Sequence, residues 1–82
     1  MIIEEMQYDD FGKYIKEQRK KSGKTLNGFA FEKDIEPVVL SRVENQKQDI
    51  KLNVLIKIAK GFGKTAGEFL TEYEKSDFSG IK

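Results

Sequence analysis

Residues 25–45 read TLNGFAFEKDIEPVVLSRVEN, and they decide the fold of this chain. Thr25 has a hydroxyl that can cap a helix, so we expect a short helix of roughly 26–33 after it. Pro37 is favoured in the first turn of a helix because its missing N–H needs no partner there. A second short helix should therefore run from Pro37 to about Asn45. Two short helices joined by a tight turn have the geometry of a helix-turn-helix, although an ordinary corner between two helices fits the periodicity equally well.

A longer helix of roughly 11–22 is expected before this pair. Asp9 or Asp10 is placed to cap its beginning, and Ser22-Gly23 is a typical helix end. Three cations in its last turn, Arg19, Lys20 and Lys21, suit the negative end of the helix dipole.

Two more helices are expected after the pair. The first spans roughly 51–61, and its apolar residues predict an inward face. The residues expected inside are Leu52, Leu55, Ile56, Ile58, Ala59 and Phe62. The second begins at Thr65, which forms a capping box with Glu68, and continues to about Lys75. Its apolar positions are Phe69, Leu70 and Tyr73.

The length of 82 residues allows one small domain. The periodicity predicts an all-α fold of five helices, with no strand or repeat. Residues 1–10 are expected to form an N-terminal arm, 11–75 the helix-turn-helix domain, and 76–82 a C-terminal tail.

The composition argues against several kinds of chemistry. Cysteine and histidine are both absent, which removes thiolate ligands and the most common metal ligand and general base. We therefore expect no enzyme, no metal, no cofactor and no small-molecule substrate. No apolar run approaches the ~20 residues that span a bilayer, and the acidic start lacks the basic region of a signal peptide. A cytoplasmic protein without a membrane partner is expected.

The net charge of +1 conceals an uneven distribution. The stretches 13–24 and 47–64 are basic, whereas 1–10 is acidic. A basic patch suits an anionic partner, but runs of charge also form on solvated helix faces, and composition alone favours the second interpretation.

The residues from Phe11 to Leu70 have a joint spacing that is more informative than any one of them. The matching positions are Arg19, Gly23, Thr25, Phe29, Ala30, Ile35, Leu40, Ser41, Arg42, Val43, Glu44, Lys47, Leu52, Leu55, Ile58, Ala59, Phe62 and Gly63. With this spacing the chain resembles the Cro and lambda-repressor (Xre) helix-turn-helix family of DNA-binding proteins. The chain length and the loop after Asn45 also resemble, more weakly, the small controller proteins of restriction-modification systems.

The resemblance implies a five-helix lambda-repressor-like domain that binds double-stranded DNA, with its third helix in the major groove. It implies base-facing positions at Glu36, Pro37, Val38 and Arg42. It implies phosphate-facing positions at Thr25, Asn45, Lys47 and Lys51. It also implies an internal ion pair between Arg19 and Glu44.

Several residues depart from the family pattern. Leu26 stands where the family usually has Gln, and a leucine cannot donate to a phosphate. Asp34 and Gln46 stand where the family usually has glycine. An aspartate can adopt the left-handed conformation, though less readily than glycine does. Pro37 and Val38 replace polar base-facing residues. These departures leave the prediction of the fold unchanged. They weaken the prediction that the domain recognises a specific DNA sequence.

Some residues have two interpretations. Arg42 could form a bidentate contact with guanine, or it could pair with an acid one helical turn away. Val38 and Val39 could touch thymine methyl groups, or they could serve a protein contact. The cluster of Arg19, Lys20, Lys21 and Lys24 could steer the domain toward DNA or be a solvated helix end.

We therefore expect a sequence-specific DNA-binding transcriptional regulator that acts as a homodimer. The alternative is a helix-turn-helix-shaped module, antitoxin-like or regulatory, that binds another protein and reads little DNA. Dimerisation is expected through some of the apolar residues of the C-terminal third, which offers more apolar surface than so small a core should need. These are Phe69, Leu70, Tyr73, Phe78 and Ile81.

Overall fold

Residues 10–76 are described by a computed structural model, and all regular structure within them is helical. The five helices are α1 (Phe11–Lys21), α2 (Leu26–Glu32), α3 (Pro37–Glu44), α4 (Leu52–Gly61) and α5 (Ala66–Lys75). The all-α, five-helix fold expected from the sequence is confirmed. Phe78 and Ile81, two of the residues expected at a dimer contact, lie outside the described residues.

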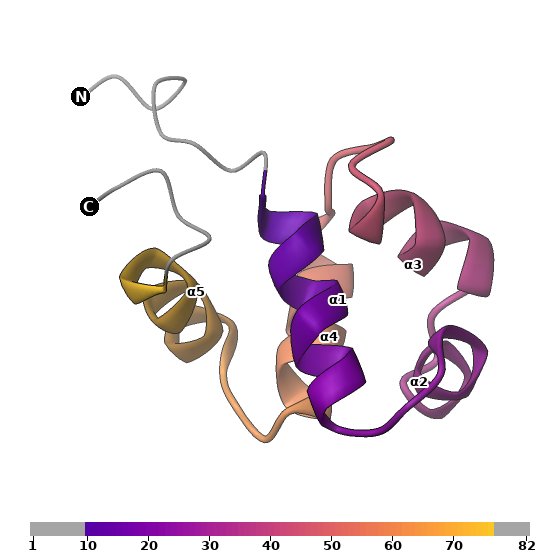
Figure 1. Ribbon diagram of the computed structural model, residues 1–82, viewed down its shortest axis with the longest axis horizontal. Helices are drawn as coiled ribbons and strands as arrows, with labels where there is room; N and C mark the ends of the chain where they lie inside the picture. Colours follow the sequence, from indigo (N-terminus) through magenta and orange to yellow (C-terminus); the bar gives the residue numbers. More distant parts are fainter. Residues whose placement is uncertain (1–9, 77–82) are drawn as a thin grey trace.

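The α2–α3 pair lies on one side of α1, and α5 lies on the other (Figure 1). Helix α3 packs against both α1 and α2, and α5 packs against α4. The helix-turn-helix thus forms one flank of the domain, with the centre of the molecule between it and α5.

Side-chain hydrogen bonds cap the beginnings of two of the five helices. The Thr25 hydroxyl accepts a hydrogen bond from the Gly28 N–H at 3.0 Å, which caps α2 as expected. Thr65 and Glu68 form both hydrogen bonds of the expected capping box at the start of α5. Asp10 occupies the N-cap position of α1, as expected, although its side chain makes no capping hydrogen bond.

The first four helices end in the same way. In each, the N–H of the second residue past the cap donates to the carbonyl oxygen five residues earlier, as in the Schellman turn. The residues in the left-handed conformation at these ends are Gly23, Asp34, Gln46 and Gly63. The C-cap residues of the first three helices are Ser22, Lys33 and Asn45, which lie outside the helices. Helices α1, α2 and α3 therefore end one residue earlier than expected.

The core is rich in aromatic side chains. Phe11 and Tyr14 of α1 meet Phe69 and Tyr73 of α5, with ring centroids of Phe11 and Tyr73 4.9 Å apart. Burial raises the pKa of the Tyr14 phenol, and the nearby Glu72 carboxylate raises it further. Phe69 and Tyr73 are fully buried within one chain, so these two residues of the C-terminal third serve the core, and the predicted dimer contact would fall to the other apolar residues there.

Helix α4 differs from the sequence expectation on one face. Leu55, Ile58 and Ala59 are buried as expected. Leu52 and Ile56 are 69% and 37% exposed, so the expectation that both lie inside is wrong. The apolar stripe of α4 is wider than the surface that its neighbours cover.

Gly12 allows α1 to approach the end of α3. A Cβ at this position would lie 2.2 Å from the Val43 carbonyl oxygen and 2.9 Å from that of Glu44. Both obstacles are backbone atoms of a helix, which cannot turn aside as a side chain can. The close packing of α1 on α3 therefore requires glycine at position 12.

We expect Gly12→Ala to lower the free energy of unfolding by roughly 1–3 kcal/mol, because α1 and α3 must separate. Gly67→Ala is the matched control, since a Cβ there meets only the Thr65 hydroxyl, at 4.0 Å. The control should be as stable as the parent or more stable by up to about 1 kcal/mol, because alanine favours a helix. Urea unfolding followed by circular dichroism measures both, and equal stability of the two variants would contradict the steric argument.

Candidate nucleic-acid interface

Helix α3 presents one face to the core and the other to solvent. Leu40 and Val43 are buried, as expected for its inner stripe. All four residues expected to face bases are exposed, and Val38 is 55% exposed. These residues are Glu36, Pro37, Val38 and Arg42. The structure thus brings the expected reading positions together on one open surface.

The turn before α3 is held at an unusual backbone conformation. Asp34 has a φ of 58°, in the left-handed region that favours glycine. The next residue, Ile35, is buried and fixes the turn to the core. The Lys57 ammonium of α4 donates a hydrogen bond to the Asp34 carbonyl oxygen at 2.9 Å and lies 3.8 Å from its carboxylate. Sequence reasoning missed Lys57, because nothing local links residues 23 positions apart.

The end of α3 is attached to α1 by a buried ion pair. The Nε of Arg19 donates to one Glu44 carboxylate oxygen at 2.8 Å, and Nη2 donates to the other at 3.0 Å. The third nitrogen, Nη1, donates to the Lys24 carbonyl oxygen at 2.8 Å. Within residues 10–76 no buried side-chain nitrogen or oxygen is left without a partner. This is the ion pair that the family resemblance implies, in the bidentate geometry that suits arginine.

Three cations lie on α3 or follow it along the chain. Arg42, Lys47 and Lys51 are exposed, and none of them pairs with a carboxylate of residues 10–76. Of the two interpretations of Arg42, the pairing with an acid one turn away therefore has no support in the described residues. Its guanidinium is available to an external anion.

The cations at the end of α1 are less available than the sequence suggests. Lys24 donates a hydrogen bond to the Glu32 carboxylate at 2.6 Å, and this contact lowers the pKa of the Glu32 carboxyl. Arg19 is buried in its ion pair. The expected basic cluster is thus reduced to Lys20 and Lys21, both exposed.

Two expected phosphate-facing residues have local contacts. Thr25 is exposed, but its oxygen accepts the capping hydrogen bond of α2, which leaves its hydroxyl proton to donate outward. The Asn45 amide lies 3.4 Å from the Ser41 hydroxyl at the exposed end of α3. Leu26, the first residue of α2, is half-buried against the core.

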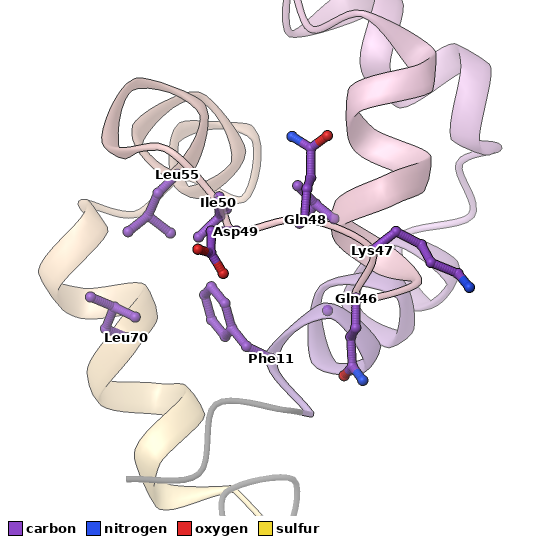
Figure 2. Close-up of a pocket in the computed structure, with 10 residues that line it drawn as sticks. Phe11, Gln46, Lys47, Gln48, Asp49, Ile50, Leu55 and Leu70 are labelled. Atoms are coloured by element: carbon purple, nitrogen blue, oxygen red, sulfur yellow. The ribbon is translucent and has the colours of Figure 1, made fainter. Parts of the chain in front are cut away.

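A cavity of about 620 Å³ lies between the loop that follows α3 and residues of α1, α4 and α5. Phe11, Leu55 and Leu70 form its apolar wall, and Asp49 lies above the Phe11 ring, whereas the Lys47 side chain extends away from it (Figure 2). The lining contains one carboxylate, that of Asp49, and it contains neither a hydroxyl nor a second acid that could act with this carboxylate in catalysis. Lys47 lies at the edge of this lining, and its ammonium points out of the cavity (Figure 2).

Other kinds of site can be tested on the same residues. Across residues 10–76, no group of acidic side chains converges in a way that could hold a metal ion. None of the helices between these residues has the length and apolarity needed to cross a bilayer.

The fold and the exposed third helix define a helix-turn-helix domain. The helix-turn-helix family matches residues 15–69 of this chain. The chain is also 35% identical over 66 residues to the control protein C.MunI of a Mycoplasma species, covering 79% of this chain and 89% of the relative. No solved structure shows a significant match. The chain belongs to the helix-turn-helix family of DNA-binding regulators, and both resemblances drawn from its sequence are confirmed.

We expect Glu44→Ala to lower the free energy of unfolding by roughly 3–5 kcal/mol, because it leaves the Arg19 charge buried and unpaired. Glu17→Ala removes the same charge from a partly exposed position of α1 and should change stability by no more than about 0.5 kcal/mol. The double variant Arg19→Met/Glu44→Leu should be more stable than Glu44→Ala, since no charge remains in the core. Urea titrations compare the three, and a Glu44→Ala variant as stable as Glu17→Ala would refute the argument.

Proposed function

We propose that this protein is a sequence-specific DNA-binding transcriptional regulator that acts as a homodimer, with α3 in the major groove of each half-site. One observation carries the proposal: the outer face of α3 is open, while its inner face is fixed by buried side chains and by the Arg19–Glu44 pair. A reading helix needs this combination, because its side chains must reach base edges from a rigid support.

The proposed contacts divide into two classes. Arg42 lies on the outer face of α3, one turn beyond Val38, and its guanidinium can donate two hydrogen bonds to a guanine. Lys47 and Lys51 follow α3, where the chain leaves the groove and passes the phosphates. Contacts of the first class give sequence preference, and those of the second give affinity and salt dependence.

Two further residues complete the proposed phosphate side. Thr25 retains a hydroxyl proton that can donate to a phosphate, and the Asn45 amide is exposed at the end of α3. Both are short side chains on elements that pack against the core. They would position α3 in the groove and contribute little to base choice.

A homodimer is proposed because one helix-turn-helix makes few base contacts. Members of this structural class reach useful specificity by binding two half-sites one helical turn apart. The relative C.MunI is named a control protein, and we propose a controlling role in transcription here as well.

A second candidate function has one observation in its favour. Phe31 of α2 is 88% exposed and Val38 of α3 is 55% exposed, so the helix-turn-helix carries apolar side chains as well as charge. A module that binds another protein through α2 and α3 would use these residues. The two functions differ in whether binding to duplex DNA depends on Arg42 and the nearby lysines.

We expect Arg42→Ala to weaken binding to the preferred duplex by roughly 1–3 kcal/mol and to relax the preference at one base pair. Lys47→Ala should instead weaken binding to all sequences alike and lower the salt slope by about one unit. Salt titrations of each variant against a preferred duplex, selected from a random pool, and a scrambled duplex separate the two effects.

Lys75→Ala serves as the control for lost charge, because Lys75 is exposed at the end of α5, on the other side of α1 from α3 (Figure 1). It should bind both duplexes as the parent does. Identical behaviour of Arg42→Ala and Lys47→Ala on both duplexes would contradict base reading by α3 and favour the protein-binding module.

We expect Glu36→Gln to raise affinity for the scrambled duplex, because the exposed Glu36 carboxylate at the start of α3 repels phosphates. The gain should shrink as salt is added, since screening weakens the repulsion that is removed. Binding of parent and variant is measured at low and high salt. An affinity that stays the same at low salt would place Glu36 away from the phosphates.

A further inference from the structure

The turn between α2 and α3 is attached to α4 by a hydrogen bond that comes from outside the helix-turn-helix. The Lys57 ammonium of α4 donates to the Asp34 carbonyl oxygen at 2.9 Å. This carbonyl belongs to the same peptide unit as the Ile35 N–H, which donates to the Ala30 carbonyl oxygen of α2 at 2.8 Å. Both polar groups of the unit are therefore engaged, one by α2 and the other by α4, and these two contacts set its orientation.

This peptide unit determines the direction in which α3 begins. Only Ile35 and Glu36 separate Asp34 from Pro37, the first residue of α3. Asp34 has a φ of 58°, in the left-handed region that residues other than glycine adopt at a cost. Glu36, at the N-cap, makes no capping hydrogen bond with its side chain. The start of α3 thus lacks the side-chain cap that Thr25 gives to α2, and the contact from α4 supports it instead.

The space between α3 and α4 is incompletely filled beside this turn. A hollow of about 260 Å³ lies there, with Val39 of α3 and Val54 of α4 in its lining. Asp34 and Lys57 line the same hollow, so their hydrogen bond joins its two sides. Close-packed neighbours would hold α3 in place on this side, but an open space does not. The contact from Lys57 therefore limits how far the beginning of α3 can shift.

We infer that Lys57 is a positioning residue for α3, and that it determines how well the domain distinguishes one DNA sequence from another. The Arg19–Glu44 pair holds the last residue of α3, and Lys57 holds the turn at its beginning. Contacts with base edges require side chains placed within about 0.5 Å. A lysine on a flexible stem still reaches a phosphate after a small shift of the helix. Loss of the Lys57 contact should therefore reduce sequence preference more than affinity for DNA in general.

The test compares Lys57→Met with the parent chain in salt titrations against the preferred and the scrambled duplex. Methionine keeps an unbranched stem and removes the donor, so affinity for the preferred duplex should fall about three- to tenfold, the usual effect of one hydrogen bond. Lys60→Met is the matched control, since it removes an exposed charge of the same helix, beside a different hollow. Lys57→Met should bind the scrambled duplex as Lys60→Met does. Equal losses on both duplexes, or no loss on either, would overturn the inference.

Two further variants separate the hydrogen bond from the charge. Asp34→Asn removes the carboxylate that lies 3.8 Å from the Lys57 ammonium, but it keeps the carbonyl oxygen, and asparagine tolerates the left-handed conformation. Lys57→Arg keeps both a donor and a positive charge. Each variant should retain the ratio of preferred to scrambled affinity of the parent. A fall in this ratio as large as that in Lys57→Met, in either variant, would contradict the role of the carbonyl contact.

Amide hydrogen exchange tests the Lys57 contact without DNA. The Ile35 amide lies in the turn, whereas the Phe69 amide donates to the Thr65 carbonyl oxygen in the first turn of α5. Lys57→Met should accelerate exchange at Ile35 about three- to tenfold and leave Phe69 nearly unchanged, because the turn opens locally. A general loss of stability would accelerate exchange at Phe69 at least as much as at Ile35, and this result would overturn the inference.

The inference rests on the proposed function, and the results separate the two. A parent chain that binds both duplexes equally would overturn the proposed function, and with it the role of Lys57 in sequence preference. A parent that prefers one duplex, with Lys57→Met showing the same preference, would overturn the inference and leave the proposed function in place. Circular dichroism of each variant shows whether its helices are retained.

Discussion

The buried contact between Arg19 and Glu44 is the interaction on which the remaining structure depends. It joins α1 to the last residue of α3, and through Nη1 it also fixes the backbone at Lys24, just before α2 begins. Removing two charges from water is costly, so the net gain in stability from such a pair is small. What the pair provides is geometry, because the planar guanidinium of an arginine donates its two parallel hydrogen bonds to a carboxylate in one orientation. The direction in which the outer face of α3 points follows from that orientation and from the close approach at Gly12.

Local chemistry made most of the helices predictable. Thr25, Pro37 and the Thr65–Glu68 pair mark helix beginnings through contacts within one turn, which a sequence displays directly. The ion pair came from the family resemblance, since spacing alone does not join residues 25 positions apart. The burial of two α4 residues was predicted wrongly, because periodicity identifies an apolar face without showing how much of it the neighbours cover. Leu52 and Ile56 lie at the edge of that face.

The candidate site was predictable in position and less so in chemistry. A net charge of +1 gives no indication of a basic surface. The structure shows why: several lysines, including Lys24 and Lys64, are paired with carboxylates, while Arg42, Lys47 and Lys51 at α3 are not. Which cations are paired depends on distances between helices, and these follow only from the folded chain. The contact from Lys57 to the Asp34 carbonyl has the same origin.

The left-handed residues Asp34 and Gln46 have a consequence for how the domain opens. They lie just before and just after α3, with φ values of 58° and 60°, and neither is a glycine. Such a conformation costs an ordinary residue such as Gln46 about 1–2 kcal/mol, and an aspartate less. The local free energy of opening is therefore lowered at both ends of α3, whereas the aromatic centre formed by α1 and α5 has no comparable weakness. Amide hydrogens of these two turns would exchange with solvent through small local fluctuations, and those of the centre only when the whole domain unfolds. The turns on either side of the proposed reading helix can thus adjust to a partner while the helix itself stays attached to the core.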